Sequence, residues 1–229
     1  MATIAFASSK GGCGKTTAAV LIACELAKQC NEKKLKVALI DADPNQHCVL
    51  WGKIEGCPDN LNLISSNEDS LLDDIENAEA EHAFTIIDLE GSANLAVAHA
   101  VCRSDIVIIP SQGSRNDEGE ALKTIKLIRN QSKALRVHIP YSILITRASP
   151  LYMSRELKAT IEDFKTSGVD VLSCQLIERT AFKSIFSFGG TLYDLDSKEV
   201  PGIDKAIDNI KALTEEIKLK LYDSLKGDK

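Results

Sequence analysis

The chain has 229 residues, of which 44% are hydrophobic and 26% are charged, and its formal net charge at pH 7 is −6. These values are ordinary for a globular α/β protein that buries a full core without disulfides or structural metals, so we expect a single domain over residues 1–229. The acidic balance excludes nucleic-acid binding through overall charge, and any contact with DNA needs a local basic patch.

The seven cysteines are odd in number and form no CxxC pair, which indicates free thiols in a reducing compartment. The four histidines show no metal-ligand spacing with them, so a metal held by Cys and His is not expected. The N-terminus lacks the pattern of a signal peptide, and no run of 18 apolar residues occurs. We therefore expect a cytoplasmic protein without a transmembrane segment.

Short apolar runs alternate with longer stretches of helical periodicity along the chain. The runs predict strands near residues 2–8, 35–41, 61–65, 84–88, 106–109, 141–145 and 170–174. The helical patterns lie at residues 15–29 and around 71–78, 121–128, 157–164 and 203–221. Continuous apolar strands suit a parallel sheet that is covered on both faces. The alternation thus predicts an α/β fold with a doubly wound, mostly parallel sheet and helices on both faces.

Residues 10–17 read Lys-Gly-Gly-Cys-Gly-Lys-Thr-Thr, between the first predicted strand and a helix. Glycines there let successive backbone N–H groups surround an anion, and the helix N-terminus adds a favourable dipole. We expect a phosphate loop for ATP and Mg²⁺, in which Lys15 reaches the β- and γ-phosphates, the Thr16 hydroxyl ligates Mg²⁺ and Thr17 contacts the α-phosphate. The nucleotide-binding set is Lys10, Gly11, Gly12, Cys13, Gly14, Lys15, Thr16 and Thr17.

The strict motif GxxxxGK[ST] is not met, because its first position is Ser9. Lys10 to Thr17 instead resembles the deviant Walker A box of the ParA/MinD family of P-loop NTPases, which includes the nitrogenase iron protein. The resemblance implies a homodimer that sandwiches ATP, with Lys10 reaching across to the partner's phosphates. It also implies slow ATP hydrolysis that a partner protein stimulates, with Lys10, Lys15 and an aspartate as the catalytic residues.

Two further segments resemble motifs of the same family. Residues 36–46, Lys-Val-Ala-Leu-Ile-Asp-Ala-Asp-Pro-Asn-Gln, resemble the DxDPxQ segment, which implies that Asp43 positions or activates the attacking water and that Asp41 supports the metal shell. Residues 84–91 resemble Walker B and a DxxG switch, in which Asp88 holds Mg²⁺ and Gly91 lets the loop move. The chain departs from the family by having Leu89-Glu90 where prolines are frequent.

The resemblance extends over residues 2–195 and is less specific beyond the switch. It implies that Arg147 and Glu178 lie near the adenine. Glu178 to Asp194 looks like the C-terminal segment of ParA, so the chain is most similar to short plasmid-type ParA proteins, with VirC-type accessory ATPases as near neighbours. An iron protein is excluded, since Cys102 alone provides no cluster pair, and the four scattered tyrosines do not suit a bacterial tyrosine kinase.

The first functional hypothesis is a ParA-like partition ATPase, whose ATP-bound dimer binds DNA nonspecifically and is activated by a ParB-like partner. Such a protein would be associated with the nucleoid. No acidic residue occurs from 121 to 138, and the basic residues there recur at helical spacing, which is typical of a phosphate-binding face or of a solvated helix. The candidate DNA contacts are Lys123, Lys126, Arg129, Lys133 and Arg136, with Arg179 and Lys183 in addition.

The alternative is a MinD-like regulator that positions a membrane-surface or other cytoplasmic cargo. Leu213, Ile217, Leu221 and Leu225 would share one face of a C-terminal helix. The acidic Glu215, Glu216 and Asp223 oppose binding to anionic lipid, which favours docking of this helix on the core. The sequence does not name the cargo or the activating partner.

Two residues have two readings each. Cys13 is either a redox-sensitive thiol at a helix N-terminus or a small residue tolerated inside the box, and the second is favoured. Trp51, the single tryptophan, is either an interface residue or a packing residue.

Overall fold

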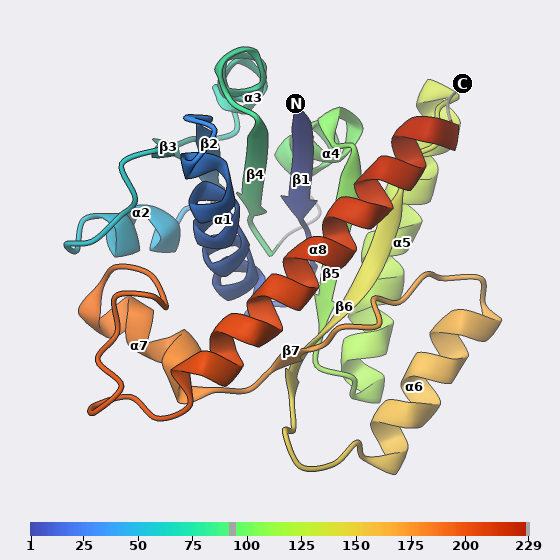
Figure 1. Ribbon diagram of the computed structural model, residues 1–229. Coiled ribbons are helices and arrows are strands. Elements are labelled where there is room, and N and C mark those ends of the chain that lie inside the picture. Colours follow the sequence, from blue (N-terminus) through green and yellow to red (C-terminus); the bar gives the residue numbers. More distant parts are fainter. Residues whose placement is uncertain (92–94, 228–229) are drawn as a thin grey trace.

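The computed structural model describes residues 1–91 and 95–227, apart from the side chains of residues 95 and 225–227 (Figure 1). Strands and helices alternate along most of the described chain. In order they are β1 (Ala2–Phe6), α1 (Lys15–Asn31), β2 (Val37–Ala42), α2 (His47–Gly52), β3 (Leu61–Ser65), α3 (Leu71–Glu81), β4 (Phe84–Leu89), α4 (Leu95–Arg103), β5 (Ile106–Ser111), α5 (Arg115–Leu135), β6 (Tyr141–Ala148), α6 (Arg155–Thr166), β7 (Leu176–Ile177), α7 (Thr180–Phe188) and α8 (Ile203–Gly227).

The strands form one sheet in the order β3-β2-β4-β1-β5-β6-β7, and every pairing is parallel. Phe6 of β1 and Asp41 of β2 are both paired with Asp88 of β4, so these three strands end at the same level. The loops that follow them therefore meet at one edge of the sheet, where open α/β sheets bind their ligands. The prediction of a parallel α/β fold is confirmed.

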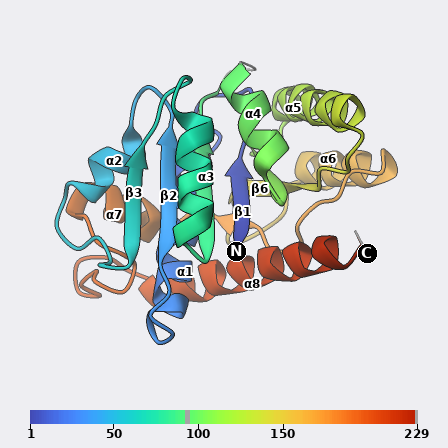
Figure 2. The ribbon, with the colours of Figure 1, turned by 90° about the horizontal axis from the view of Figure 1, so that it is seen from above.

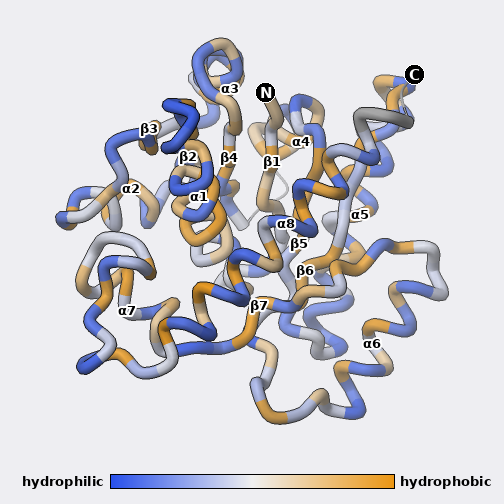
Figure 3. Tube along the Cα trace, viewed as in Figure 1, coloured by the Kyte–Doolittle hydropathy of each residue, from blue (hydrophilic) through white to orange (hydrophobic). Residues whose placement is uncertain are grey.

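Helices cover both faces of the sheet, as the view from above shows (Figure 2). One apolar cluster joins the sheet to α1, α7 and α8, and the other joins it to α3, α4, α5 and α6. The alternation of side chains along a strand explains this division, because Ile4 and Phe6 enter the first cluster while Ala5 and Ala7 enter the second. Apolar colour is accordingly concentrated along the strands (Figure 3).

The predicted strand at residues 170–174 is wrong. Val171 forms only an isolated bridge with Ile143, and the last strand is the short β7 further along the chain. The backbone N–H groups of Ser173 and Cys174 donate instead to the Glu216 carboxylate of α8, each at 2.7 Å. A helix side chain thus takes the donors that a longer strand would have used for pairing.

Helix α8 packs along the sheet with its apolar face inward. Leu213, Ile217 and Leu221 are at most 3% exposed, which confirms that this helix docks on the core. The predicted fourth member of that face, Leu225, lies outside the described side chains. Within residues 1–91 and 95–227, no helix combines the length and apolarity needed to cross a membrane.

Candidate nucleotide-binding site

The segment between β1 and α1 folds as a loop around an open backbone cradle. Gly12 and Gly14 have φ angles of 72° and 96°, values that strain any residue with a Cβ. Gly14 is the N-cap of α1, and Lys15 is the first residue of the helix. The N-terminal end of α1 therefore opens into the loop, which is the geometry that binds phosphate.

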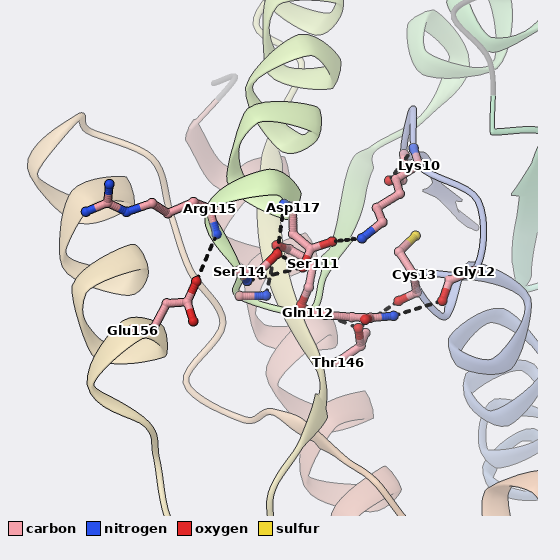
Figure 4. A network of polar contacts seen from close by, with 12 residues as sticks. Lys10, Gly12, Cys13, Ser111, Gln112, Ser114, Arg115, Asp117, Thr146 and Glu156 are labelled. Carbon is pink, nitrogen blue, oxygen red and sulfur yellow. Dashed lines mark hydrogen bonds and ion pairs between the residues drawn. The ribbon is translucent and has the colours of Figure 1, made fainter.

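Contacts from the end of β5, from β6 and from α5 hold this loop in place, and Figure 4 shows part of the network. The Thr146 hydroxyl donates to the Cys13 carbonyl at 2.7 Å, and the Gln112 side-chain amide donates to the Gly12 carbonyl at 2.9 Å. The Ser9 hydroxyl donates to the Glu120 carbonyl at 2.8 Å. Cys13 is 1% exposed, which favours its reading as a small packed residue.

Lys10 points away from the cradle. Its Nζ forms an ion pair with Oδ1 of Asp117 at 2.5 Å (Figure 4). Asp117 lies in the first turn of α5, where its carboxylate also accepts from the backbone N–H and the hydroxyl of Ser114. The ammonium group of Lys10 therefore contacts α5 of its own chain.

Two buried carboxylates lie beneath the loop. Asp41 and Asp88 are both fully buried, and Asp41 accepts from the backbone N–H of Val49 at 3.0 Å. The Cys48 thiol donates to Oδ2 of Asp88 at 3.4 Å. Oδ1 of Asp88 has no hydrogen-bond partner among the described residues. Burial raises the pKa of Asp88 to about 6, with Asp41 adding to the effect while Thr16 and Lys15 oppose it.

This arrangement fits a hard divalent cation. Thr16 lies near enough to Asp88 to lower the pKa of that carboxyl group, so a hydroxyl and a carboxylate approach each other at the N-terminus of α1. An unpartnered carboxylate oxygen in a buried site is a group that a metal or its water would satisfy. Oxygen ligands of this kind suit Mg²⁺. Cys48 lies within the same cluster as Asp41 and Asp88, although its thiol is a soft group and suits Mg²⁺ poorly.

Asp43 lies two residues after Asp41 and lines the open cleft. Its Oδ1 accepts from the backbone and side-chain N–H groups of Asn45, both at 2.8 Å. On the opposite side, a Cβ built on Gly91 would lie 3.5 Å from Nζ of Lys15, so the end of the 84–91 segment reaches the loop. The cleft measures about 390 Å³ and is lined by Gly11, Gly12, Gly14, Lys15, Thr16, Thr17, Asp43, Asn45, His47, Glu90, Gly91 and Arg147.

A second, less polar pocket adjoins the cleft through Gly14, Thr17 and Arg147. Leu176, Ile177 and Phe182 give it apolar walls of the kind that receive a flat ring. Its polar lining includes Glu178, Arg179 and Lys183, with Lys183 paired to Glu178 at 2.8 Å. Arg147 lines it with a φ of 51°, a left-handed conformation that is uncommon outside glycine.

Comparison with known proteins identifies the family of the chain. The family described as "VirC1 protein" matches residues 1–219. This chain belongs to the VirC1 protein family. "Protein ParA" of Rhizobium radiobacter is 32% identical to this VirC1-family chain over 227 residues, which cover 99% of the chain and 100% of that relative.

Solved structures show the same fold as this VirC1-family chain. Apo McdA of Cyanothece has a TM-score of 0.74 at 18% identity, with 93% of this chain and 98% of that chain covered. A plasmid partition protein of Borrelia burgdorferi, described as putative and bound to AMPPNP, has a TM-score of 0.64 at 22% identity, covering 92% and 97%. The fold and the family together identify a P-loop ATPase of the ParA type.

The basic residues of the VirC1-family chain divide between two places. Lys123, Lys126, Arg129, Lys133 and Arg136 are all exposed on or just after α5. Lys123 is paired with Glu120 at 2.7 Å, and Arg129 donates to the Tyr141 hydroxyl at 2.9 Å. Arg179 and Lys183, in contrast, line the second pocket and do not extend the α5 face.

Several residues of the site in this VirC1-family chain are not predicted from the sequence. Asp117 could have been found from Ser114-x-x-Asp117, a helix-start pattern that forms a capping box here. Gln112, Thr146 and Cys48 carry no such signal, because their partners are distant in sequence. Trp51 is 2% exposed and donates to the Gly190 carbonyl at 3.1 Å, so it is a packing residue.

Proposed function

We propose that this chain is a ParA-like ATPase that forms an ATP-dependent sandwich dimer, binds DNA nonspecifically and drives partition of a replicon through partner-stimulated hydrolysis. The observation that carries the proposal is the meeting of Lys15, Asp43 and the Asp41–Asp88 pair around one glycine cradle. The full-length similarity to "Protein ParA" supports the partition role. The AMPPNP in the Borrelia partition protein supports ATP as the nucleotide.

Each side chain of the cleft has a defined task in this proposal. Lys15 and the N–H groups of residues 11–17 bind the phosphates, where positive charge must gather as the γ-phosphoryl group leaves. Thr16, Asp88 and Asp41 would hold Mg²⁺, which neutralises phosphate charge when it is bound. Asp43, which faces the cleft, positions the attacking water. Arg147 and Glu178 flank the adenine in the second pocket.

The proposed dimer depends on Lys10. A sandwich requires this lysine to leave its own chain and contact the phosphates bound by the partner. Its side chain is 38% exposed, so it is accessible from the edge of the sheet. Hydrolysis would remove the contact that joins the two protomers and return the protein to the monomer.

The exposed face of α5 is the candidate surface for DNA. It presents five basic side chains in a segment without acidic residues, and cationic faces of this kind bind the phosphate backbone without reading sequence. An acidic protein depends on such a face, because its overall charge repels DNA. The activating partner would be a cargo-bound protein of the ParB type.

Binding to random-sequence duplex DNA tests this function. It is measured with Mg²⁺ and ATP, ADP or no nucleotide, at low and at physiological salt. We expect binding with ATP only, and a steep loss of affinity as salt rises. Lys126→Glu with Lys133→Glu should abolish binding, whereas Lys205→Glu, an exposed lysine on α8, changes net charge without touching the face. ATP-dependent dimers that bind no DNA under any condition would overturn the DNA role.

A further inference from the structure

Lys10 is held by a carboxylate that is itself held firmly. The side chain of Asp117 is 3% exposed. Its Oδ2 accepts from the Ser114 backbone N–H at 3.1 Å and from the Ser114 hydroxyl at 2.6 Å. Ser114 in return caps α5 by accepting from the Asp117 N–H. These contacts fix Asp117 at the helix N-terminus, where a negative charge is favourable. The carboxylate therefore stays in place whether or not Lys10 is present.

The charge of Asp117 is also maintained. Burial raises the pKa of Asp117, but the hydrogen bonds from Lys10 and Ser114 outweigh burial and lower it overall. A buried carboxylate that stays ionised attracts a neighbouring ammonium group strongly. Lys10, by contrast, is a long side chain that can rotate away without disturbing the helix.

The phosphate loop does not need to move when Lys10 leaves. Gln112 and Thr146 donate to backbone carbonyls of the loop, and the Ser9 hydroxyl of the loop donates to the Glu120 carbonyl of α5. None of these three hydrogen bonds involves the Lys10 ammonium group. Breaking the ion pair thus frees one side chain while the cradle keeps its shape. The ion pair and the sandwich contact exclude each other, because one ammonium group cannot occupy both positions.

We propose that Asp117 is a positioning residue that holds Lys10 within its own protomer and so opposes dimerisation until ATP is bound. The inference rests on the proposed sandwich dimer and adds a competing partner for its central lysine. Two such ion pairs must open for each dimer formed. The protein concentration at which ATP drives dimerisation is therefore set in part by this residue.

The test compares Asp117→Asn with the wild type in the presence of Mg²⁺ and a non-hydrolysable ATP analogue, by light scattering over a concentration series. Asparagine keeps the size and can accept from Ser114, but it lacks the charge. Loss of one ion pair of this exposure should change the dimerisation equilibrium constant by about threefold. Because two ion pairs open for each dimer, the dimer dissociation constant should fall by about tenfold. Analogue affinity per site, measured on dilute monomer, should not change.

Two matched variants separate this role from a merely structural one. Asp117→Glu keeps the carboxylate and should restore the wild-type dissociation constant. Glu118→Gln makes the same charge change in the same turn of α5, away from the Lys10 contact, and should leave the constant unchanged. Thermal melting of each variant verifies that the fold is intact.

The outcomes distinguish the two proposals. An Asp117→Asn protein that dimerises as the wild type does, or more weakly, overturns the holding role, and weaker dimerisation would show that Asp117 receives the partner's lysine instead. If neither protein dimerises although both bind the analogue, the sandwich dimer itself is refuted, and this inference with it.

Discussion

Asp41 and Asp88 are paired in register across β2 and β4, and neither carboxylate is accessible to solvent. Adjacent parallel strands bring two acidic groups together at the edge where the phosphate loop begins. Desolvation is the main cause that raises the pKa of Asp88 from 3.8 to about 6, and Asp41 contributes. Without a cation, the ionised pair therefore destabilises the folded protein.

This relationship predicts a pH-dependent effect of Asp88→Asn on the metal-free protein. The raised pKa means that protonated Asp88 is favoured in the folded state. The resulting contribution to stability is fully present below pH 3.8 and is lost as the pH rises through about 6. The variant should match the wild type at low pH and exceed it by roughly 2–3 kcal/mol near neutral pH. Denaturant unfolding in chelator, from acid to neutral pH, measures the difference.

Mg²⁺ with ATP should reverse this ranking, because ligand binding stabilises only the protein that retains its metal-holding carboxylate. Parallel stability curves for wild type and Asp88→Asn across the whole pH range would contradict the prediction.

Lys15→Ala should weaken ATP binding by about 100-fold, since the charge-assisted bonds of one ammonium group to phosphate are lost. Lys15 is 6% exposed at the start of α1, so no neighbouring lysine can take its place without moving the loop. Titration calorimetry gives the affinity. Lys36→Ala, an exposed lysine before β2, is the control and should bind as the wild type does. Unchanged affinity in Lys15→Ala would remove the phosphate-loop assignment.

Asp43→Ala should bind ATP, lose hydrolysis and remain dimeric. The carboxylate faces the cleft and is oriented by Asn45, but it is not one of the loop residues that bind phosphate. Dimer lifetime after addition of ATP and Mg²⁺ is followed by light scattering, alongside phosphate release. Dissociation at the wild-type rate would show that Asp43 does not position the water.

Leu213→Ala should destabilise the protein by about 2–5 kcal/mol, because it opens a cavity between α8 and the sheet. Leu219 lies on the same helix but is 64% exposed, so Leu219→Ala should change stability by less than about 0.5 kcal/mol. Chemical unfolding compares the two. Equal effects at both positions would contradict the docking of this helix on the core.

Features carried by local pattern could be predicted from the sequence. The apolar runs identified six of the strands because a parallel strand is buried on both faces and tolerates few polar residues. The glycine box was evident because its residues are contiguous. The roles of Lys10, Asp43, Arg147 and Glu178 stay predictions. Asp43 and Arg147 line the cleft and Glu178 lines the adjoining pocket, whereas Lys10 is paired with Asp117.

Features set by distant partners could not be predicted. Residues 170–174 look like a strand, but Glu216 on α8 takes the backbone donors. Arg179 and Lys183 look like further members of a cationic surface until the chain folds them around a pocket. The pairing of Lys10 with Asp117 spans 107 positions, and neither residue alone indicates it.

The chain has one tryptophan, and it lies beside the phosphate loop. The indole of Trp51 joins α2, which follows the Asp43 loop, to Gly190 beyond α7, and it borders a groove that also contains Thr16 and Thr17. Any rearrangement of these segments alters the surroundings of a single fluorophore. The protein therefore contains an intrinsic optical reporter, with no other indole to obscure its signal.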